Sequence, residues 1–302
     1  MGRNHTIAPL SWEKLDPDYA DRGGYDRDFL RVRVLTPKLS DALKPKPEPT
    51  IDVLAYEHFS VQLNPDRKLA FWTAVNIDGS KPRRLGDRAA DVWWFDERED
   101  DLKPYQTGNK FYTGSGFQRG HLVRRLDPAW GDSDTEAARG EADSFHWTNC
   151  SPQIPALNTQ WWAKVENHVL DTADAANERI TVFSGCVFTS KDPTYRSLKI
   201  PLAFWKVVAW TVGKSKPSLR SLAFVVKQDE AVAKLLKLKG VQPLAVDLAD
   251  VPSAIQGYQT TVAALEKMTG IAFGGLSKPS VDVYAAKRKT CLLYTSPSPR
   301  DS

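Results

Sequence analysis

The residues best suited to chemistry in this sequence lie within the short segment 117–121. Arg119 and His121 stand two positions apart, with Gly120 between them. In an extended segment, side chains two positions apart project to the same face. A guanidinium can grip a phosphate through paired hydrogen bonds, and an imidazole, whose ordinary pKa is near neutrality, can take a proton from water. The pair therefore suits work on a phosphodiester, although an exposed basic strand would have the same composition.

A second group of candidates lies on a predicted helix within residues 148–176. The buried stripe of this helix recurs every four residues, at Leu157, Trp161, Val165 and Val169. Asn158 and Glu166 lie beside the stripe, separated by a rise of about 12 Å at ~1.5 Å per residue. This separation is too long for two inner ligands of one ion. If both serve one metal, one binds it directly and the other reaches its water shell.

The elements that must position these residues are short strands and few helices. Residues 69–77 are apolar in both registers, which predicts a strand buried on both sides, with 57–63 as its antiparallel partner. Further strands are expected at 180–188, 202–212 and 221–226, and helices at 229–239 and 260–269, the second ending at Gly270. Because regular βαβ alternation is missing, we expect an α+β domain with a mostly antiparallel sheet.

These separated segments together resemble the DNA/RNA non-specific endonuclease family, the ββα-metal nucleases. The resemblance covers roughly residues 51–275. It rests on Gln-Arg-Gly-His at 118–121, where the family has Asp-Arg-Gly-His, and on Thr-Asn-Cys-Ser-Pro-Gln at 148–153 followed by Asn158, Trp162 and Glu166. Segments around Gly185 and at 204–206 match later blocks of the family. The resemblance implies a ββα-metal nuclease fold, in which helices flank a central, mostly antiparallel sheet.

The resemblance also implies a role for each candidate residue. His121 would be the general base that activates a water, and Asn158 would bind a single Mg²⁺ directly, with Mn²⁺ as a substitute. Glu166 would hydrogen-bond the metal-bound waters, and Asn149 would support the geometry of the site. Arg119 and Arg83 would act on the phosphate, with Arg84 as the alternative to Arg83 if the loop alignment shifts by one. DNA and RNA are the implied partners, and a homodimer is the implied assembly.

One position departs from the family pattern. Gln118 stands where the family has an acid, which removes a negative charge beside the base and the metal. We expect reduced activity, and the alternative is a nucleic-acid-binding homologue that kept the fold and lost turnover. A nuclease toxin domain is a third hypothesis, for which a delivery module would be expected.

Composition and segment boundaries set the remaining expectations. The chain has 302 residues and a formal net charge of +4, which is compatible with a polyanionic partner. Three cysteines without metal-type spacing argue against a disulfide framework or a structural zinc site. Neither a signal-peptide core nor a membrane-spanning run is recognisable, so a cytoplasmic protein is expected. We expect an arm and proline-rich linker at 1–50, the nuclease domain at 51–275, a polar tail at 276–290, and an adapter-derived artefact at 291–302.

Overall fold

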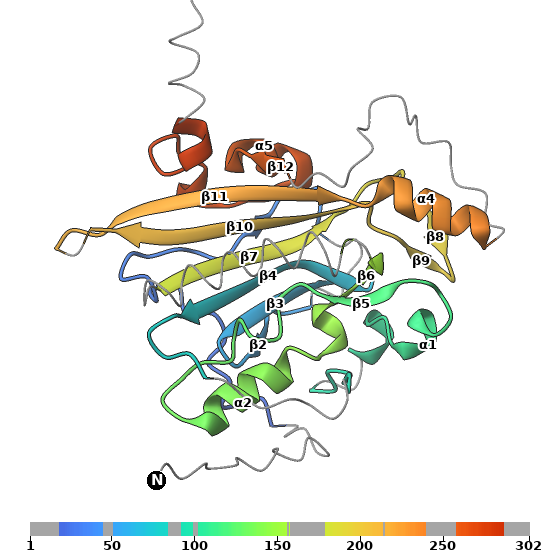
Figure 1. Cartoon of the computed structure of the whole chain (residues 1–302), viewed down its shortest axis with the longest axis horizontal. Coiled ribbons are helices and arrows are strands. Elements are labelled where there is room, and N and C mark those ends of the chain that lie inside the picture. Colours follow the sequence, from blue (N-terminus) through green and yellow to red (C-terminus); the bar gives the residue numbers. More distant parts are fainter. Residues whose placement is uncertain are drawn as a thin grey trace, which may run out of the picture.

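The computed structural model describes residues 18–44, 51–83, 92–98, 102–155, 157, 179–213, 215–239 and 258–286. Its centre is an antiparallel sheet in which seven described strands follow the order β12-β11-β10-β7-β4-β3-β2 (Figure 1). These strands are β2 (Leu54–Tyr56), β3 (Phe59–Asn64), β4 (Leu69–Asp78), β7 (Arg179–Val187), β10 (Ala203–Val212), β11 (Ser218–Lys227) and β12 (Tyr258–Thr260). The antiparallel prediction is therefore confirmed.

Both faces of the sheet are covered, which explains why its strands are apolar in both registers. Every residue of β4 is buried, as the sequence of 69–77 predicted. On β10, Phe204 and Val208 belong to one hydrophobic cluster, whereas Trp205 and Val207 belong to a second cluster on the other face. Strand alternation thus divides the protein into two cores that share one sheet.

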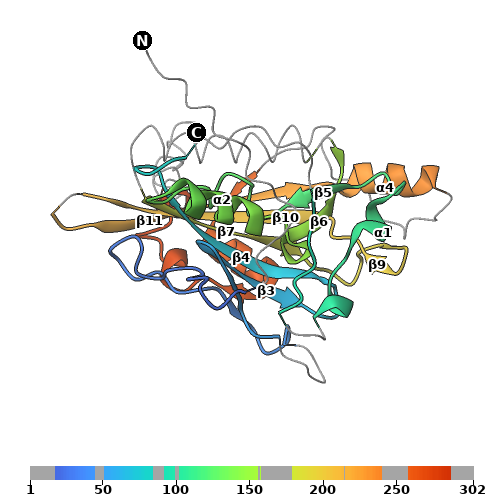
Figure 2. The same cartoon turned by 90° about the horizontal axis from the view of Figure 1, so that it is seen from below.

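The first of these cores carries the smaller elements of the middle of the chain. They are the 3₁₀ turn η1 (Lys103–Tyr105), helix α1 (Asn109–Tyr112), strand β5 (Gln118–His121), helix α2 (Asp134–Asp143), the 3₁₀ turn η2 (Trp147–Asn149) and strand β6 (Cys150–Gln153). Strands β8 (Thr194–Tyr195) and β9 (Leu198–Lys199) form a hairpin nearby, and helix α4 (Asp229–Leu238) follows β11. Figure 2 shows α2, β5 and β6 together on one side of the long strands.

The second core is closed by the N-terminal segment and by the last described elements. Tyr25, Phe29 and Leu30 pack there against the central sheet. Strand β1 (Lys38–Leu39) pairs with β13 (Ile271–Ala272), which follows helix α5 (Val262–Thr269) and precedes the 3₁₀ turn η4 (Gly274–Ser277). Helix α5 ends at Gly270, whose φ of 69° is the left-handed conformation expected of a glycine C-cap.

One predicted strand needs adjustment, one helix was not predicted, and one predicted helix lies mostly outside the described residues. The strand expected at 57–63 begins at Phe59, because Glu57 and His58 form the turn of the β2–β3 hairpin, and His58 has a φ of 65°. Helix α2 was not anticipated, although Ser133 caps it by accepting a hydrogen bond from the Glu136 amide. The helix expected within 148–176 begins after β6, and its residues 156 and 158–176 lie outside the described residues.

In the part of the chain that the structure describes, each helix is too short or too polar to traverse a lipid bilayer.

Candidate active site

The predicted catalytic histidine lies at the end of a two-stranded ribbon. Strand β5 pairs with β6 in antiparallel register, which sets Gln118 opposite Gln153 and His121 opposite Cys150. The segment 118–121 is extended, as the sequence indicated. Among the described strands the ribbon is a sheet of its own, hydrogen-bonded apart from the central sheet.

The imidazole of His121 is half-buried between aromatic rings. Its centroid lies 4.5 Å from the Trp93 ring and 4.6 Å from Phe145, whose ring meets it edge-on at 89°. Aromatic walls on two sides restrict rotation of the ring without supplying a formal charge. The structure therefore holds His121 in one orientation, with Nε2 buried although the residue as a whole is only half-buried.

Asn149 ties the ribbon to the chain that follows His121. Its carbonyl oxygen Oδ1 accepts from the Val123 amide at 2.8 Å, and its Nδ2 donates to the carbonyls of Val123 at 2.9 Å and Ser144 at 2.8 Å. The Asn149 backbone carbonyl also accepts from the Leu122 amide at 3.0 Å. Because the side chain is fully buried, these bonds are protected from competition with water.

A buried lysine bonds the same segment to the central sheet. Lys206, on β10, is 1% exposed, and its Nζ donates to the Leu122 carbonyl at 3.0 Å and to Ser184 Oγ at 2.9 Å. Burial raises the pKa of Asp127, and the nearby Lys206 ammonium acts in the opposite direction. The sequence showed Lys206 only as part of a family block, so its role was not predicted.

Gly120 is required by the close approach of Gln153. A Cβ added at Gly120 would lie 2.1 Å from Gln153 Cδ, far inside contact distance. Gln153 is fully buried, and its side-chain amide has no hydrogen-bond partner in the described part of the chain. This places an available polar group beneath the strand that carries His121. Sequence reasoning quoted Gln153 within a motif but assigned it no role.

Gly120→Ala is expected to lower the free energy of unfolding by about 1–3 kcal/mol, the usual range for overpacking a filled core. Urea denaturation of the purified variant measures this change. Gly275→Ala is the matched control, because nothing lies within 4 Å of a Cβ built at Gly275. Equal free energies of unfolding for the two variants would show that the Gln153 side chain moves aside without destabilising the protein.

The two arginine candidates lie in different surroundings. Arg119 is exposed on β5, and its Nη2 donates to Asn109 Oδ1. Arg83 donates to the backbone carbonyls of Gly131 at 3.2 Å and Asp132 at 2.9 Å, and its guanidinium lies 3.4 Å from an Asp134 oxygen. Its contacts thus lead to the start of α2 rather than to the β5–β6 ribbon.

The remaining sequence candidates lie outside the described residues. These are Asn158, Glu166 and the alternative arginine Arg84. Their roles stay predictions that follow from the motif spacing.

Neighbouring histidine and cysteine residues have structural roles. His146 is fully buried, with Nδ1 bonded to the Asp143 carbonyl and Nε2 accepting from the Tyr19 hydroxyl at 2.6 Å. Burial lowers the pKa of His146, so the neutral ring is favoured. Burial also raises the pKa of the Cys150 thiol, and raises that of Cys186 to about 12. These thiols are therefore unsuited to nucleophilic work.

Comparison with known proteins identifies the family and the fold. The family model for DNA/RNA non-specific endonuclease matches residues 42–278. The chain belongs to the DNA/RNA non-specific endonuclease family. The structure of a chain in the EndoG/EndoGI complex superposes with a TM-score of 0.52, covering 73% of this chain and 84% of that chain at 16% identity. The expected α+β, ββα-metal nuclease fold is thereby confirmed.

Curated relatives place this member within the family. Uncharacterized protein y4fB of Sinorhizobium fredii is 39% identical over 83% of this chain and 39% of its own length. A nuclease of a Nostoc species is 24% identical over 59% of this chain and 62% of its own. Human mitochondrial endonuclease G is 30% identical over 37% of this chain and 35% of its own. The chain therefore spans less than two thirds of the length of each of these relatives.

Proposed function

We propose that this family member is an endonuclease that hydrolyses phosphodiester bonds in DNA and RNA with little sequence preference. The observation that carries the proposal is the fixed position of His121 at the end of the β5–β6 ribbon. Asn149 and Lys206 bond the residues that follow it, and Trp93 and Phe145 hold its ring. A base held in this way is prepared for one proton transfer at one place.

In the proposed reaction, His121 takes a proton from a water that attacks phosphorus. Arg119, exposed on the same strand, binds a non-bridging phosphate oxygen through its guanidinium. Arg83 would steady the developing charge after exchanging its backbone carbonyl partners for phosphate oxygens. Contacts with phosphate and sugar carry little sequence information, which accounts for broad specificity.

The donor set that the motif supplies fits Mg²⁺. An amide oxygen from Asn158, with a Glu166 carboxylate acting through waters, is a hard oxygen set of the kind that Mg²⁺ prefers. Both residues follow shortly after β6, the partner strand of His121. Asn158 would hold the ion directly and Glu166 would orient its waters. When bound, the ion would offset charge on the phosphate and on the departing sugar oxygen.

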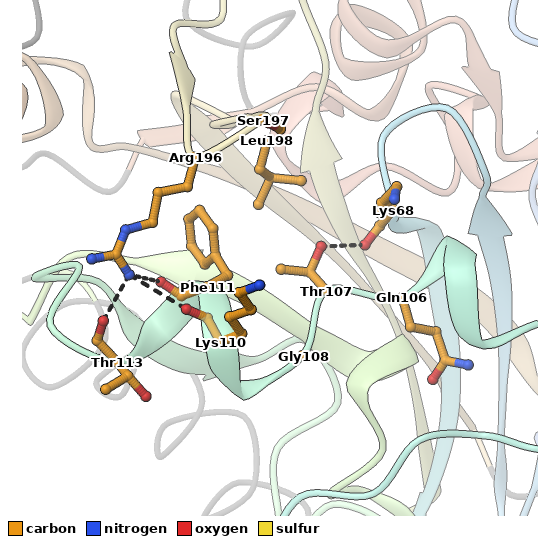
Figure 3. A pocket seen from close by; sticks show the side chains of 10 residues that line it. All are labelled: Lys68, Gln106, Thr107, Gly108, Lys110, Phe111, Thr113, Arg196, Ser197 and Leu198. Carbon is orange, nitrogen blue, oxygen red and sulfur yellow. Dashed lines mark hydrogen bonds between the residues drawn. The ribbon is translucent and has the colours of Figure 1, made fainter.

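A basic pocket beside the ribbon supports a nucleic-acid substrate. Its cavity of about 830 Å³ is lined by Lys68, Gln106, Thr107, Gly108, Lys110, Phe111, Thr113, Arg196, Ser197 and Leu198 (Figure 3). Asn109, which accepts a hydrogen bond from Arg119, stands between two of these lining residues. The pocket therefore adjoins the arginine proposed to bind phosphate.

The backbone around this pocket contains several residues in the left-handed conformation. Of five described non-glycine residues with positive φ, three line the pocket: Lys68 at 52°, Arg196 at 47° and Ser197 at 67°. Such conformations cost energy and persist where the surroundings enforce them, often at functional sites. Arg196 Nη1 donates to the carbonyls of Phe111 at 2.8 Å and Thr113 at 2.7 Å, as the dashed lines in Figure 3 show.

Replacing both pocket lysines, in the double variant Lys68→Asn and Lys110→Gln, is expected to raise KM for duplex DNA about tenfold with little change in kcat. The slope of log KM against log salt should flatten by about 2, at ~0.9 for each phosphate that a lysine no longer neutralises. Asparagine at 68 tolerates the positive φ. The double variant Lys267→Gln and Lys278→Gln is the control. It removes the same charge from two exposed positions, one on α5 and one directly after η4, which do not line the pocket. If the two double variants show the same salt slope, the pocket lysines do not bind phosphate groups of the substrate.

The proposed activity is tested by incubating plasmid DNA and total RNA with the purified protein, with Mg²⁺ or with EDTA. Cleavage of both substrates that depends on the added ion is the expected result. The alternative, a binding protein that has lost turnover through Gln118, predicts retardation of both substrates in a gel without cleavage. That outcome would overturn the endonuclease proposal.

A further inference from the structure

Three potential metal ligands meet where the β2–β3 turn faces helix α2. Glu57 and His58 form the turn, and Glu136 lies in the first turn of α2. His58 Nε2 lies 3.1 Å from Glu136 Oε1 and 3.3 Å from Glu57 Oε1. One ligand atom from each of the three residues lies within 4.8 Å of the other two.

The histidine presents Nε2 to the carboxylates because its other nitrogen is engaged. His58 Nδ1 bonds to the Pro128 carbonyl at 2.9 Å, and since a carbonyl can only accept, Nδ1 carries the hydrogen. The ring stacks on Trp130 at a centroid distance of 3.6 Å and an angle of 12°. A histidine whose Nδ1–H is held by a backbone carbonyl, with Nε2 directed at acidic groups, has the orientation found in metal sites.

Each carboxylate is also held by its second oxygen. Glu57 Oε2 forms an ion pair with Arg139, and Glu136 Oε2 accepts from the Asp132 amide at 2.8 Å. These partners direct both Oε1 atoms toward His58 Nε2. Supporting contacts of this kind orient metal ligands in proteins and contribute strongly to affinity.

A cation between the three converging atoms would satisfy all of them at once. Ionised carboxylates carry no hydrogen, and one N–H on Nε2 points along a single line, so it cannot serve two oxygens well. An ion at the centre serves all three atoms. Ligand atoms bound to tetrahedral zinc at ~2.1 Å lie about 3.4 Å apart, close to the two separations from Nε2. The Glu136 side chain is 30% exposed, which leaves access for a water as fourth ligand.

A helix-capping role explains only part of this arrangement. Glu136 stands three residues after the Ser133 cap, where a capping-box glutamate is common. The Asp132 amide engages its Oε2, while Oε1 turns to the histidine. His58 also has a positive φ of 65°, which is uncommon for non-glycine residues, although histidine adopts it more often than most.

We propose that Glu57, His58 and Glu136 bind a divalent first-row transition metal ion, zinc by preference, with water completing a tetrahedral shell. The site joins the β2–β3 turn to helix α2, and it shares no ligand with the motif proposed to bind Mg²⁺. Its role is to stabilise the fold, so it does not depend on the proposed nuclease activity.

Zinc binding is tested in an Asn158→Ala background, which removes the ligand proposed for the catalytic ion. Titration calorimetry with ZnCl₂ is expected to give one site, and adding His58→Asn should abolish it. Asparagine tolerates the positive φ at this position, so the turn is preserved. At zinc 100-fold above Kd, the midpoint of thermal unfolding should rise by about 5 °C only where His58 is present.

Two further measurements keep this test decisive. Glu136→Gln, at a partly exposed helix position, should also abolish the zinc response if His58→Asn fails to fold. His121→Ala should retain the response, because His121 contributes no ligand to this site. The proposal would be overturned if the proteins with and without His58 bound zinc with equal stoichiometry. It would also be overturned if the Asn158→Ala protein took up no zinc. Either result would favour a protonated imidazole between the two carboxylates.

Discussion

His121→Ala is expected to slow phosphodiester cleavage by about a thousandfold, within the usual contribution of a positioned general base. The fold should survive, because His121 is only half-buried and lies in a short ribbon outside the central sheet. Affinity for nucleic acid should change little, since the proposed phosphate contacts belong to cations. The loss should therefore appear in kcat and not in KM.

Single-turnover cleavage of a labelled duplex at saturating enzyme measures this change. Added imidazole should restore part of the rate in His121→Ala, because a free base can enter the space left by the ring. A structural defect would show no such recovery. Cleavage by His121→Ala at the wild-type rate would exclude His121 as the base while leaving the endonuclease proposal intact.

Asn149→Asp is expected to lower the free energy of unfolding by about 3 kcal/mol and the cleavage rate by more than tenfold. The two side chains have the same shape, but aspartate has no N–H to donate. The carbonyls of Val123 and Ser144 would then face an acceptor in a fully buried setting. Because Val123 lies two residues beyond His121, displacement of its backbone moves the proposed base.

Asn64→Asp is the matched control for this change. Asn64 is 5% exposed, and its described hydrogen bond uses the side-chain oxygen, which accepts from the Arg67 amide at 3.1 Å. Aspartate keeps that acceptor, so a much smaller loss is expected in urea denaturation. Similar losses in the two variants would mean that burial of any carboxylate, and not the missing donor of Asn149, sets the cost.

Much of the fold could be predicted from local pattern. Strands β4, β7, β10 and β11 are read correctly because residues with apolar side chains in both registers must be covered on both faces. The turn at His58 was missed because the alternation of Phe59, Val61 and Leu63 continues the strand pattern backwards to Glu57. Helix α2 was missed because its buried residues are mostly alanine and polar, so it lacks a strong apolar stripe.

The site could be predicted only where chemistry and sequence spacing coincide. His121 and Asn149 belong to two short motifs, and pairing of β5 with β6 brings them together. Lys206 lies 84 residues beyond Leu122, so its hydrogen bond depends on the tertiary fold. The same holds for His58 and Glu136, which are 78 residues apart and carry no shared motif. Arg83 was expected to act on phosphate, and that role stays a prediction, since its present partners lie near α2.

The separation of the β5–β6 ribbon from the central sheet has a consequence for heat inactivation. The inner strands of the long sheet are hydrogen-bonded to neighbours on both sides, whereas the ribbon is attached through side chains such as Asn149 and Lys206. Local openings of such a unit require less free energy than global unfolding. Warming is therefore expected to abolish the proposed activity through local unfolding of the ribbon while the central sheet remains folded. Cooling is expected to restore the activity quickly, because the sheet does not have to refold.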